Sequence, residues 1–253
     1  MFSKDVNNIV RNYMNIYEIL DLNMEKKEVL SFVGGGGKTT SIFLLGKELK
    51  KLNKRVLITT TTAMFSPNRE DYDYFLLKEV KNNFFPHKGT ITIYGENIKN
   101  GKLIGSEVSK VDNIIKRDLF DFILIEADGS KGRSIKAPEV YEPVISKLTT
   151  KTIGIIGLEA LGEKISEETV HRPEIFTKVI GKDLYNIINE NDVVKLVLHK
   201  NGLFKDAQGE KVLILNKAIN QERINKGCKV KEMLLNTKLN KILVADIKEK
   251  KFY

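Results

Sequence analysis

A run of four glycines directly after a short apolar segment constrains the fold of this chain more than any other feature. Val29 to Val33 is an almost uninterrupted apolar run, typical of a buried parallel strand. After the glycines, apolar residues recur at helical spacing from Thr39 to about Leu52. The segment from Arg55 to Ile58 predicts another strand, and the order strand, helix, strand favours a right-handed parallel crossover. The sequence therefore predicts a parallel α/β sheet.

Later apolar runs extend this sheet. Strands are predicted at Phe122 to Ile125, Thr152 to Ile156, Lys211 to Leu215 and Lys241 to Ala245, and helices at Glu107 to Arg117 and Glu222 to Leu235. The dipeptide Asn100-Gly101 accommodates positive φ in a tight turn, so we expect a small hairpin insertion over residues 90–105. The pattern predicts a doubly wound, mostly parallel sheet that forms a single domain over residues 1–253.

Composition excludes several classes of protein. The 253 residues carry a net charge of +9, but the basic residues are spread along the chain without interleaved aromatics, so no nucleic-acid surface is expected. A single cysteine, Cys228, rules out a disulfide framework, and His87, His171 and His199 are too far apart in sequence to favour a histidine-built zinc site. No apolar stretch approaches a membrane span or a signal peptide. We expect a cytoplasmic protein without a membrane partner.

The glycine segment predicts a phosphate-binding loop because it follows a strand and opens a helix. Main-chain amides at glycines can converge on phosphate oxygens, Lys38 would meet the terminal phosphates, and the Thr39 hydroxyl suits Mg²⁺. The candidate nucleotide-binding residues here are Gly34, Gly35, Gly36, Gly37, Lys38, Thr39 and Thr40. The alternative is a flexible turn beside a surface lysine. Phe32 stands where the pattern GxxxxGK[ST] has its first glycine, and the shorter loop resembles the ATP-binding loop of the Mur ligases, which favours ATP over GTP.

Two acids close the strand that ends near residue 126. Ligands of doubly wound sheets bind at the carboxyl ends of the strands, so Glu126 and Asp128 are expected beside the glycine loop. Glu126 is the candidate metal ligand together with Thr39, and Asp128 is the candidate group that positions the attacking oxygen, which makes Lys38 and Asp128 the candidate catalytic pair. Mur ligases have a comparable EAD at this strand end. The alternative is a solvated turn.

Polar residues after two strands add to this edge. Thr59 to Thr62 either offer hydroxyls to phosphate and metal-bound water or are simply strand residues. Lys131, Arg133 and Lys136 lie in a glycine-containing loop that either holds a second anionic substrate, closes over the nucleotide, or is a mobile surface loop.

A further strand exit carries Asn216 and Lys217, which begin like the guanine-recognition motif NKxD. Ile219 occupies the position of the aspartate and cannot accept hydrogen bonds from a base, so the choice between ATP and GTP stays open. Asn216 and Lys217 are candidate nucleotide contacts or an ordinary strand exit. His171 precedes a helix and is either catalytic or a structural hydrogen-bonding group.

Five segments together resemble the YqeC family, accessory proteins of selenium-dependent molybdenum hydroxylases. They are FVGGGGKTT, ITTTTAMF, ILIEADGSKGRSIKAP with YEPVI, GLEALGEKISEETVHRPEIF and LILNKAI. Ala63 departs from the family pattern, where a histidine is expected, and Ile219 departs where an aspartate is expected. The resemblance implies a P-loop NTPase-like fold and a part in maturing or inserting a molybdenum or selenium cofactor of a hydroxylase.

Three functions fit these observations. The first is a Mg²⁺-dependent nucleotide-binding protein that hydrolyses its nucleotide and acts as an accessory factor for a molybdenum hydroxylase. The second is an ATP-dependent ligase or kinase that acts on an anionic acceptor. The third is a nucleotide-gated module that transfers a cofactor without catalysis. The sequence leaves the client protein and the oligomeric state open.

Overall fold

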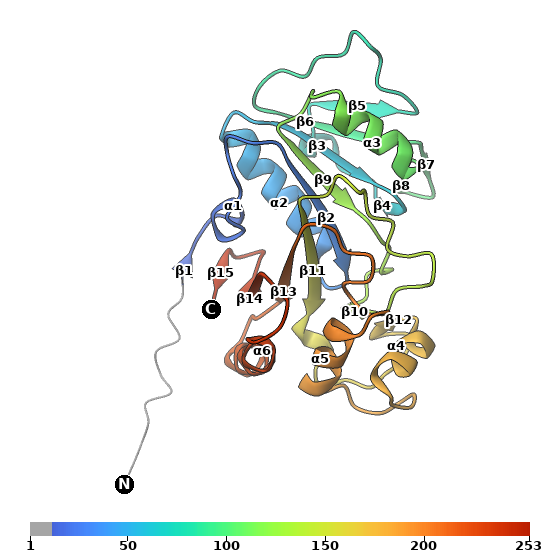
Figure 1. The fold of residues 1–253 in the computed structure, drawn as a ribbon, viewed down its shortest axis with the longest axis vertical. Helices are drawn as coiled ribbons and strands as arrows, with labels where there is room; N and C mark the ends of the chain where they lie inside the picture. The colour runs from blue at the N-terminus through green and yellow to red at the C-terminus, as the bar shows by residue number, and fades with distance from the viewer. Residues whose placement is uncertain (1–11) are drawn as a thin grey trace.

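A single large sheet organises the computed structural model, which describes residues 12–253 (Figure 1). Within this range ten strands pair in the order β1 (Asn12–Tyr13), β15 (Lys251–Phe252), β14 (Lys241–Asp246), β13 (Glu210–Asn216), β11 (Lys151–Gly157), β2 (Glu28–Gly34), β9 (Phe122–Glu126), β3 (Arg55–Thr60), β6 (Thr90–Gly95) and β5 (Tyr74–Leu77). The strands from β14 to β5 are parallel, and β15 and β1 extend one edge by antiparallel pairing. Every residue of β2, β9 and β11 is buried, as expected for a parallel sheet covered on both faces.

Helices cover both faces of the sheet, which confirms the predicted doubly wound α/β fold. One face packs against α1 (Ile16–Ile19) and α2 (Lys38–Lys51), and the other packs against α3 (Val108–Lys116), α4 (Pro173–Ile180), α5 (Glu190–Leu198) and α6 (Gln221–Leu234). Two short 3₁₀ helices, η1 (Arg69–Asp71) and η2 (Leu158–Ala160), lie in connections. Alternation along β3 shows the two faces: Val56 and Ile58 pack with the α2 side, and Leu57 packs with α3.

The predicted hairpin insertion is shorter in the structure. The first part of the range, Thr90–Gly95, is β6 of the main sheet, paired in parallel with β3. Only β7 (Asn97–Lys99) and β8 (Lys102–Ile104) form the hairpin, with Asn100 and Gly101 both at positive φ in the turn. The alternating buried residues Ile91 and Ile93 pack against the α2 side of the core, and this burial places the segment in the sheet.

Two small sheets stand at the carboxyl edge of the large one (Figure 1). β8 pairs antiparallel with β4 (Ala63–Phe65), which directly follows β3. β10 (Ile135–Lys136) pairs in parallel with β12 (Val170–His171), which precedes α4. These sheets bring segments far apart in the sequence to the edge where the glycine loop lies. In the described part of the chain, no helix is long and apolar enough to cross a lipid bilayer.

Candidate functional site

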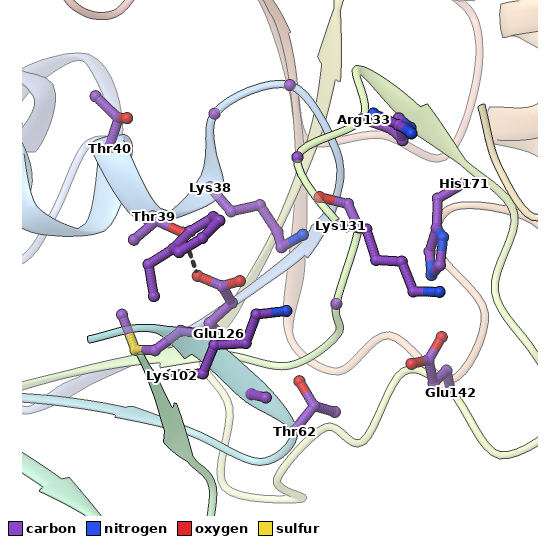
Figure 2. Close-up of a pocket in the computed structure, with 18 of the residues that line it drawn as sticks. Lys38, Thr39, Thr40, Thr62, Lys102, Glu126, Lys131, Arg133, Glu142 and His171 are labelled. Carbon is purple, nitrogen blue, oxygen red and sulfur yellow. Dashed lines mark hydrogen bonds between the residues drawn. The ribbon is translucent and has the colours of Figure 1, made fainter. Parts of the chain in front are cut away.

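A cavity of about 480 Å³ opens at the carboxyl edge of the sheet (Figure 2). Strand register explains why these residues meet: Glu126 of β9 lies opposite Phe32 of β2 and Thr60 of β3, and Asn216 of β13 lies opposite Gly157 of β11. The lining consists of Gly36, Gly37, Lys38, Thr39, Thr40, Thr62, Ala63, Met64, Phe65, Lys102, Glu126, Gly129, Ser130, Lys131, Gly132, Arg133, Glu142, His171, Arg172 and Lys217. Ligand sites of α/β sheets occupy this position.

The glycine loop requires glycine at its tip. Gly36 has φ +80°, and a Cβ there would lie 2.2 Å from the amide nitrogen of Gly157. The amides of Gly34, Gly35 and Gly36 donate to Asp128 Oδ2, to the carbonyl of Ile155 and to the carbonyl of Arg133, at 3.0, 2.9 and 3.0 Å. These three amides shape the loop and are not directed at a ligand. The groups available for an anion are therefore the main-chain amides from Gly37 to Thr40, where α2 begins.

Lys38 lies inside the loop. Its side chain is almost fully buried, and Nζ lies 2.5 Å from the carbonyl oxygen of Gly34 and 3.1 Å from Asp128 Oδ1. A buried ammonium group needs such partners, because burial without them costs several kcal/mol. A phosphate that reached the loop would offer oxygens in place of these two partners.

Thr39 and Glu126 form the pair predicted to hold a metal. The Thr39 hydroxyl donates to Glu126 Oε2 at 2.7 Å, and both residues line the cavity (Figure 2). Burial raises the pKa of Glu126 above its usual value, and the neighbouring charge of Lys38 opposes this shift. Two oxygen donors suit Mg²⁺, which keeps several waters and takes further oxygens from substrate phosphates. Within residues 12–253 there is no group of three or more His, Cys, Asp or Glu side chains placed to hold a metal.

Asp128 lies behind the loop and does not line the cavity. Its Oδ2 accepts the Gly34 amide, and the carboxylate forms buried ion pairs with Lys38 and with Lys136, whose Nζ lies 3.3 Å away. Asp128 therefore fixes the lysine and the loop. The role predicted for it, to position an attacking oxygen, would require access to the cavity, which this arrangement does not give.

The cations of the 129–136 loop separate into two groups. Lys131 and Arg133 line the cavity, and their role toward a second anionic substrate stays a prediction. Lys136 is 1% exposed, and its Nζ donates to the Gly129 carbonyl at 2.8 Å and to Glu142 Oε2 at 2.7 Å. The pairing of β10 with β12 turns Lys136 inward, so this lysine belongs to a buried charge network and does not face a substrate.

Arg172 and His171 lie on the same side of the cavity. Arg172 forms an ion pair with Glu142; burial would raise the pKa of Glu142, but the hydrogen bonds from Arg172 and Lys136 lower it to about 2. Burial, together with the positive charges of Lys136 and Arg172, lowers the pKa of His171 to about 4, so the imidazole is neutral at pH 7. The sequence left His171 between a catalytic and a structural role, and the structure places it in the cavity wall.

Asn216 and Lys217 have protein partners. The Asn216 side chain donates to the Gly36 carbonyl at 2.8 Å and accepts the Ile247 amide at 3.0 Å, so it ties the end of β13 to the glycine loop. Lys217 lines the cavity and forms an ion pair with Glu159. Ile219 is exposed. Asn216 holds the loop from behind, and only Lys217 of this motif faces the cavity.

The threonine segment contributes mainly to the sheet. The hydroxyls of Thr59, Thr60 and Thr61 each donate to a main-chain carbonyl at 2.8 Å, those of Tyr94, Glu126 and Val144. Thr62 alone of the four lines the cavity. The strand alternative therefore describes Thr59 and Thr60, which belong to β3, and Thr61 follows the strand with its hydroxyl bonded to the main chain.

Sequence reasoning missed Phe65, Lys102 and Arg172, which also line the cavity. Lys102 and Phe65 reach it through the pairing of β4 with β8, and Arg172 reaches it because it follows β12. Local periodicity carries no signal for either pairing. An aromatic residue three positions after the last threonine is the one local feature that could have pointed to this wall.

Comparisons with known proteins show the family of this chain. The family model described as YqeC protein matches residues 30–174, a range that includes the glycine loop, both acids and Arg172. A protein of Escherichia coli K12 named "Uncharacterized protein YqeC" is 34% identical over 239 residues, which cover 91% of this chain and 92% of that relative. The chain belongs to the YqeC family. Family membership and the parallel sheet with its glycine loop were both predicted from the sequence and are confirmed.

Proposed function

We propose that this YqeC family member is a Mg²⁺-dependent nucleotide-binding protein that hydrolyses nucleoside triphosphates. One observation supports this above all: the glycine loop presents the first-turn amides of α2, Lys38 and the Thr39–Glu126 pair to one cavity. Amides, an ammonium group and oxygen ligands for Mg²⁺ are the groups that phosphoryl transfer requires, because catalysis there consists of positioning and charge stabilisation.

Each group has a definite role in this proposal. The amides from Gly37 to Thr40 receive phosphate oxygens, and Lys38 exchanges its contacts with Gly34 and Asp128 for the terminal phosphates. Thr39 and Glu126 hold Mg²⁺, which would neutralise charge that develops on the phosphates. Asp128 and Lys136 keep the loop in this geometry from behind.

ATP is the proposed nucleotide. In the NKxD arrangement a carboxylate accepts hydrogen bonds from guanine, and here Ile219 occupies that position while Asn216 is bonded to the loop and to Ile247. Neither residue can therefore read guanine through the hydrogen bonds of that motif. The resemblance of the loop to that of the Mur ligases also supports ATP.

Calorimetric titration with ATP and GTP, each with and without Mg²⁺, tests this proposal. We expect Lys38→Ala to weaken ATP binding about 10- to 100-fold, as expected when a charge-assisted contact is lost. Lys51→Ala is the matched control, because Lys51 is an exposed lysine of the same helix outside the cavity. Glu126→Gln should remove most of the difference between measurements with and without Mg²⁺. Equal heats from the native protein and Lys38→Ala would eliminate the site.

The cellular role proposed for this activity is that of an accessory factor in the maturation or insertion of the molybdenum or selenium cofactor of a hydroxylase. The family resemblance described above supports this role. Copurification of the full chain with a molybdenum hydroxylase, dependent on ATP and lost in Lys38→Ala, tests it. Retention that is the same with and without nucleotide would contradict it.

The position of Asp128 favours a second candidate, the nucleotide-gated module. This carboxylate does not line the cavity, so the acids in the lining are Glu126 and Glu142. Glu142 is already paired with two cations, Lys136 and Arg172. Tight ATP binding without release of inorganic phosphate would support this candidate over hydrolysis. The ligase or kinase alternative depends on a second ligand in the same cavity.

A further inference from the structure

One wall of the cavity carries two side chains that lie outside the hydrophobic core. We call these two residues, Phe65 on β4 and its cross-strand partner Lys102 on β8, the ring wall; Met64, which precedes Phe65, also lines the cavity. Met64 is 2% exposed and belongs to the core, whereas Phe65 is 60% exposed although it lines a cavity. An exposed phenyl ring contributes little to folding, because it leaves most of its apolar surface in water. Its position suits contact with a ligand.

Two lysines bring unpaired charge to this space. Lys102 Nζ lies 5.7 Å from the centre of the Phe65 ring, and Lys102 and Lys131 both extend into the cavity, from β8 and from the 129–133 loop (Figure 2). Across residues 12–253, neither lysine has a carboxylate within ion-pair distance. Among the other basic residues that line the cavity, Arg172 pairs with Glu142 and Lys217 pairs with Glu159, whereas Arg133 donates to the main-chain carbonyl of Glu167 and adds positive charge on the side of Lys131. Two unneutralised ammonium groups in one cavity favour a ligand with two negative charges.

The ring wall lies on the metal side of the proposed nucleotide. Glu126 ends β9, and β3 and β4 follow beyond it, while Lys217 follows β13 on the opposite side of β2. Thr39 and Glu126 would hold Mg²⁺ on the same side of β2 as Phe65 and Lys102, and the ion would supply positive charge there to the terminal phosphate. The space beside it is open to a second molecule.

From these observations we propose that the ring wall and Lys131 form a subsite for a second ligand, a dianionic group attached to a planar aromatic ring, beside the terminal phosphate of the nucleotide. The ring stacks on Phe65, and the dianion contacts Lys102 and Lys131. The orientation relative to the nucleotide rests on the proposed function, whereas the ring wall and its two lysines do not.

Three small probes separate the two parts of this recognition: phenyl phosphate, cyclohexyl phosphate and benzyl alcohol. NMR titrations on the full chain, saturated with Mg²⁺ and a non-hydrolysable ATP analogue, give the dissociation constants. We expect phenyl phosphate to bind about fivefold more tightly than cyclohexyl phosphate, as expected for aromatic pairing, and benzyl alcohol not to saturate. Phe65→Leu should make the two phosphates equal.

The hairpin offers a matched control for charge. Lys99 and Lys102 are cross-strand partners in β7 and β8, but Lys99 is exposed and outside the cavity lining. We expect Lys102→Gln to weaken both phosphates about fivefold and Lys99→Gln to change them less than twofold. Equal effects of Lys102→Gln and Lys99→Gln, or no saturable binding of phenyl phosphate, would overturn the subsite.

Two further measurements distinguish this proposal from the nucleotide proposal. Titration of Phe65→Leu with the ATP analogue shows whether the ring holds the nucleobase; a loss of ATP affinity as large as the loss for phenyl phosphate would overturn the second-ligand subsite. Phenyl phosphate is also titrated into nucleotide-free Lys38→Ala. Binding there that still depends on Phe65 and Lys102 supports the subsite even where ATP binding fails, and binding that disappears assigns the probe to the glycine loop.

Discussion

The back of the glycine loop and the ring wall line the same edge of the sheet, but their charges are arranged in opposite ways. In the charge network at the loop, Lys38, Asp128, Lys136 and Glu142 alternate in sign, and each is almost fully buried against an oppositely charged partner. On the ring wall, Lys102 has no such partner in the described range, and Phe65 is exposed. The first region is complete without a ligand, and the second is not. The comparison teaches that contacts within the protein fix the geometry of the glycine loop, whereas the side chains of the ring wall remain available to recognise a ligand.

The largest difference between the two regions is expected in a test at Lys136. Its replacement in Lys136→Met leaves Asp128 and Glu142 with one fewer cation in a buried network, which should lower the free energy of unfolding by about 3 to 5 kcal/mol. Lys131→Met removes an exposed cavity lysine and should change it by less than about 0.5 kcal/mol. Urea unfolding measures both. Similar losses in the two variants would mean that the two regions do not differ in the way described.

Replacing a glycine by alanine should lower stability by a smaller amount, and again by more in the glycine loop than in the 129–133 loop. At Gly36 an alanine combines positive φ with a Cβ 2.2 Å from the Gly157 nitrogen, and we expect a loss of about 2 to 3 kcal/mol together with weaker ATP binding. Gly132 has nearly the same positive φ, but a Cβ there meets no atom within 4 Å, so Gly132→Ala should cost about 1 kcal/mol. Thermal unfolding compares them. An equal cost would show that the loop tip tolerates displacement.

The same contrast explains which parts of the molecule could be predicted from sequence. Strands β2, β9, β11 and β13 and helix α2 were predicted to within two residues, because buried apolar runs and helical spacing are local properties. The apolar segment 90–95 was assigned to an insertion because the strong turn signal at Asn100-Gly101 drew the boundary too early. Its place in the sheet depends on pairing with β3, which no local pattern encodes.

Site residues divide along a similar line. Gly36, Gly37 and Thr39 were assigned to the site from a strand–loop–helix context, Glu126 was assigned from its place at a strand end, and all four line the cavity. Asp128 and Lys136 were assigned by their proximity in sequence, but the β10–β12 pairing turns Lys136 inward toward Asp128. Phe65, Lys102 and Arg172 depend on contacts between distant segments. Sequence therefore identifies the glycine loop and not the opposite wall.

A pH-dependent effect of about 1 kcal/mol is expected at His171, at the boundary between the two regions. Burial and the nearby Lys136 and Arg172 lower the pKa of His171 from 6.5 to about 4. The unfolded chain therefore binds the proton more strongly, and stability should fall as the pH decreases from about 6.5 toward 4. Because the His171 side chain is partly exposed, solvent screens its charge, and we expect the free energy of unfolding to change by about 1 kcal/mol.

Urea unfolding at pH 7 and pH 5 measures this dependence. His171→Asn should reduce the difference between the two pH values, and His87→Asn, at an exposed position, should leave it unchanged. A native slope of the opposite sign would contradict a neutral imidazole in this wall. An unaltered slope in His171→Asn would assign the dependence to other groups.

The smallest expected effect sharpens the comparison most, because it tests whether the ring wall serves the fold at all. Phe65→Thr places a good strand residue at a position that is 60% exposed, so the free energy of unfolding should change by less than about 0.5 kcal/mol. Met64→Thr, one residue earlier on β4, creates a polar cavity at a position that is 2% exposed and should cost about 2 to 4 kcal/mol. Urea unfolding of the two variants therefore separates a residue kept for packing from one that packing does not require. If Phe65→Thr lowered the free energy of unfolding as much as Met64→Thr, Phe65 would be a packing residue, and the reason to assign it to a ligand would be removed.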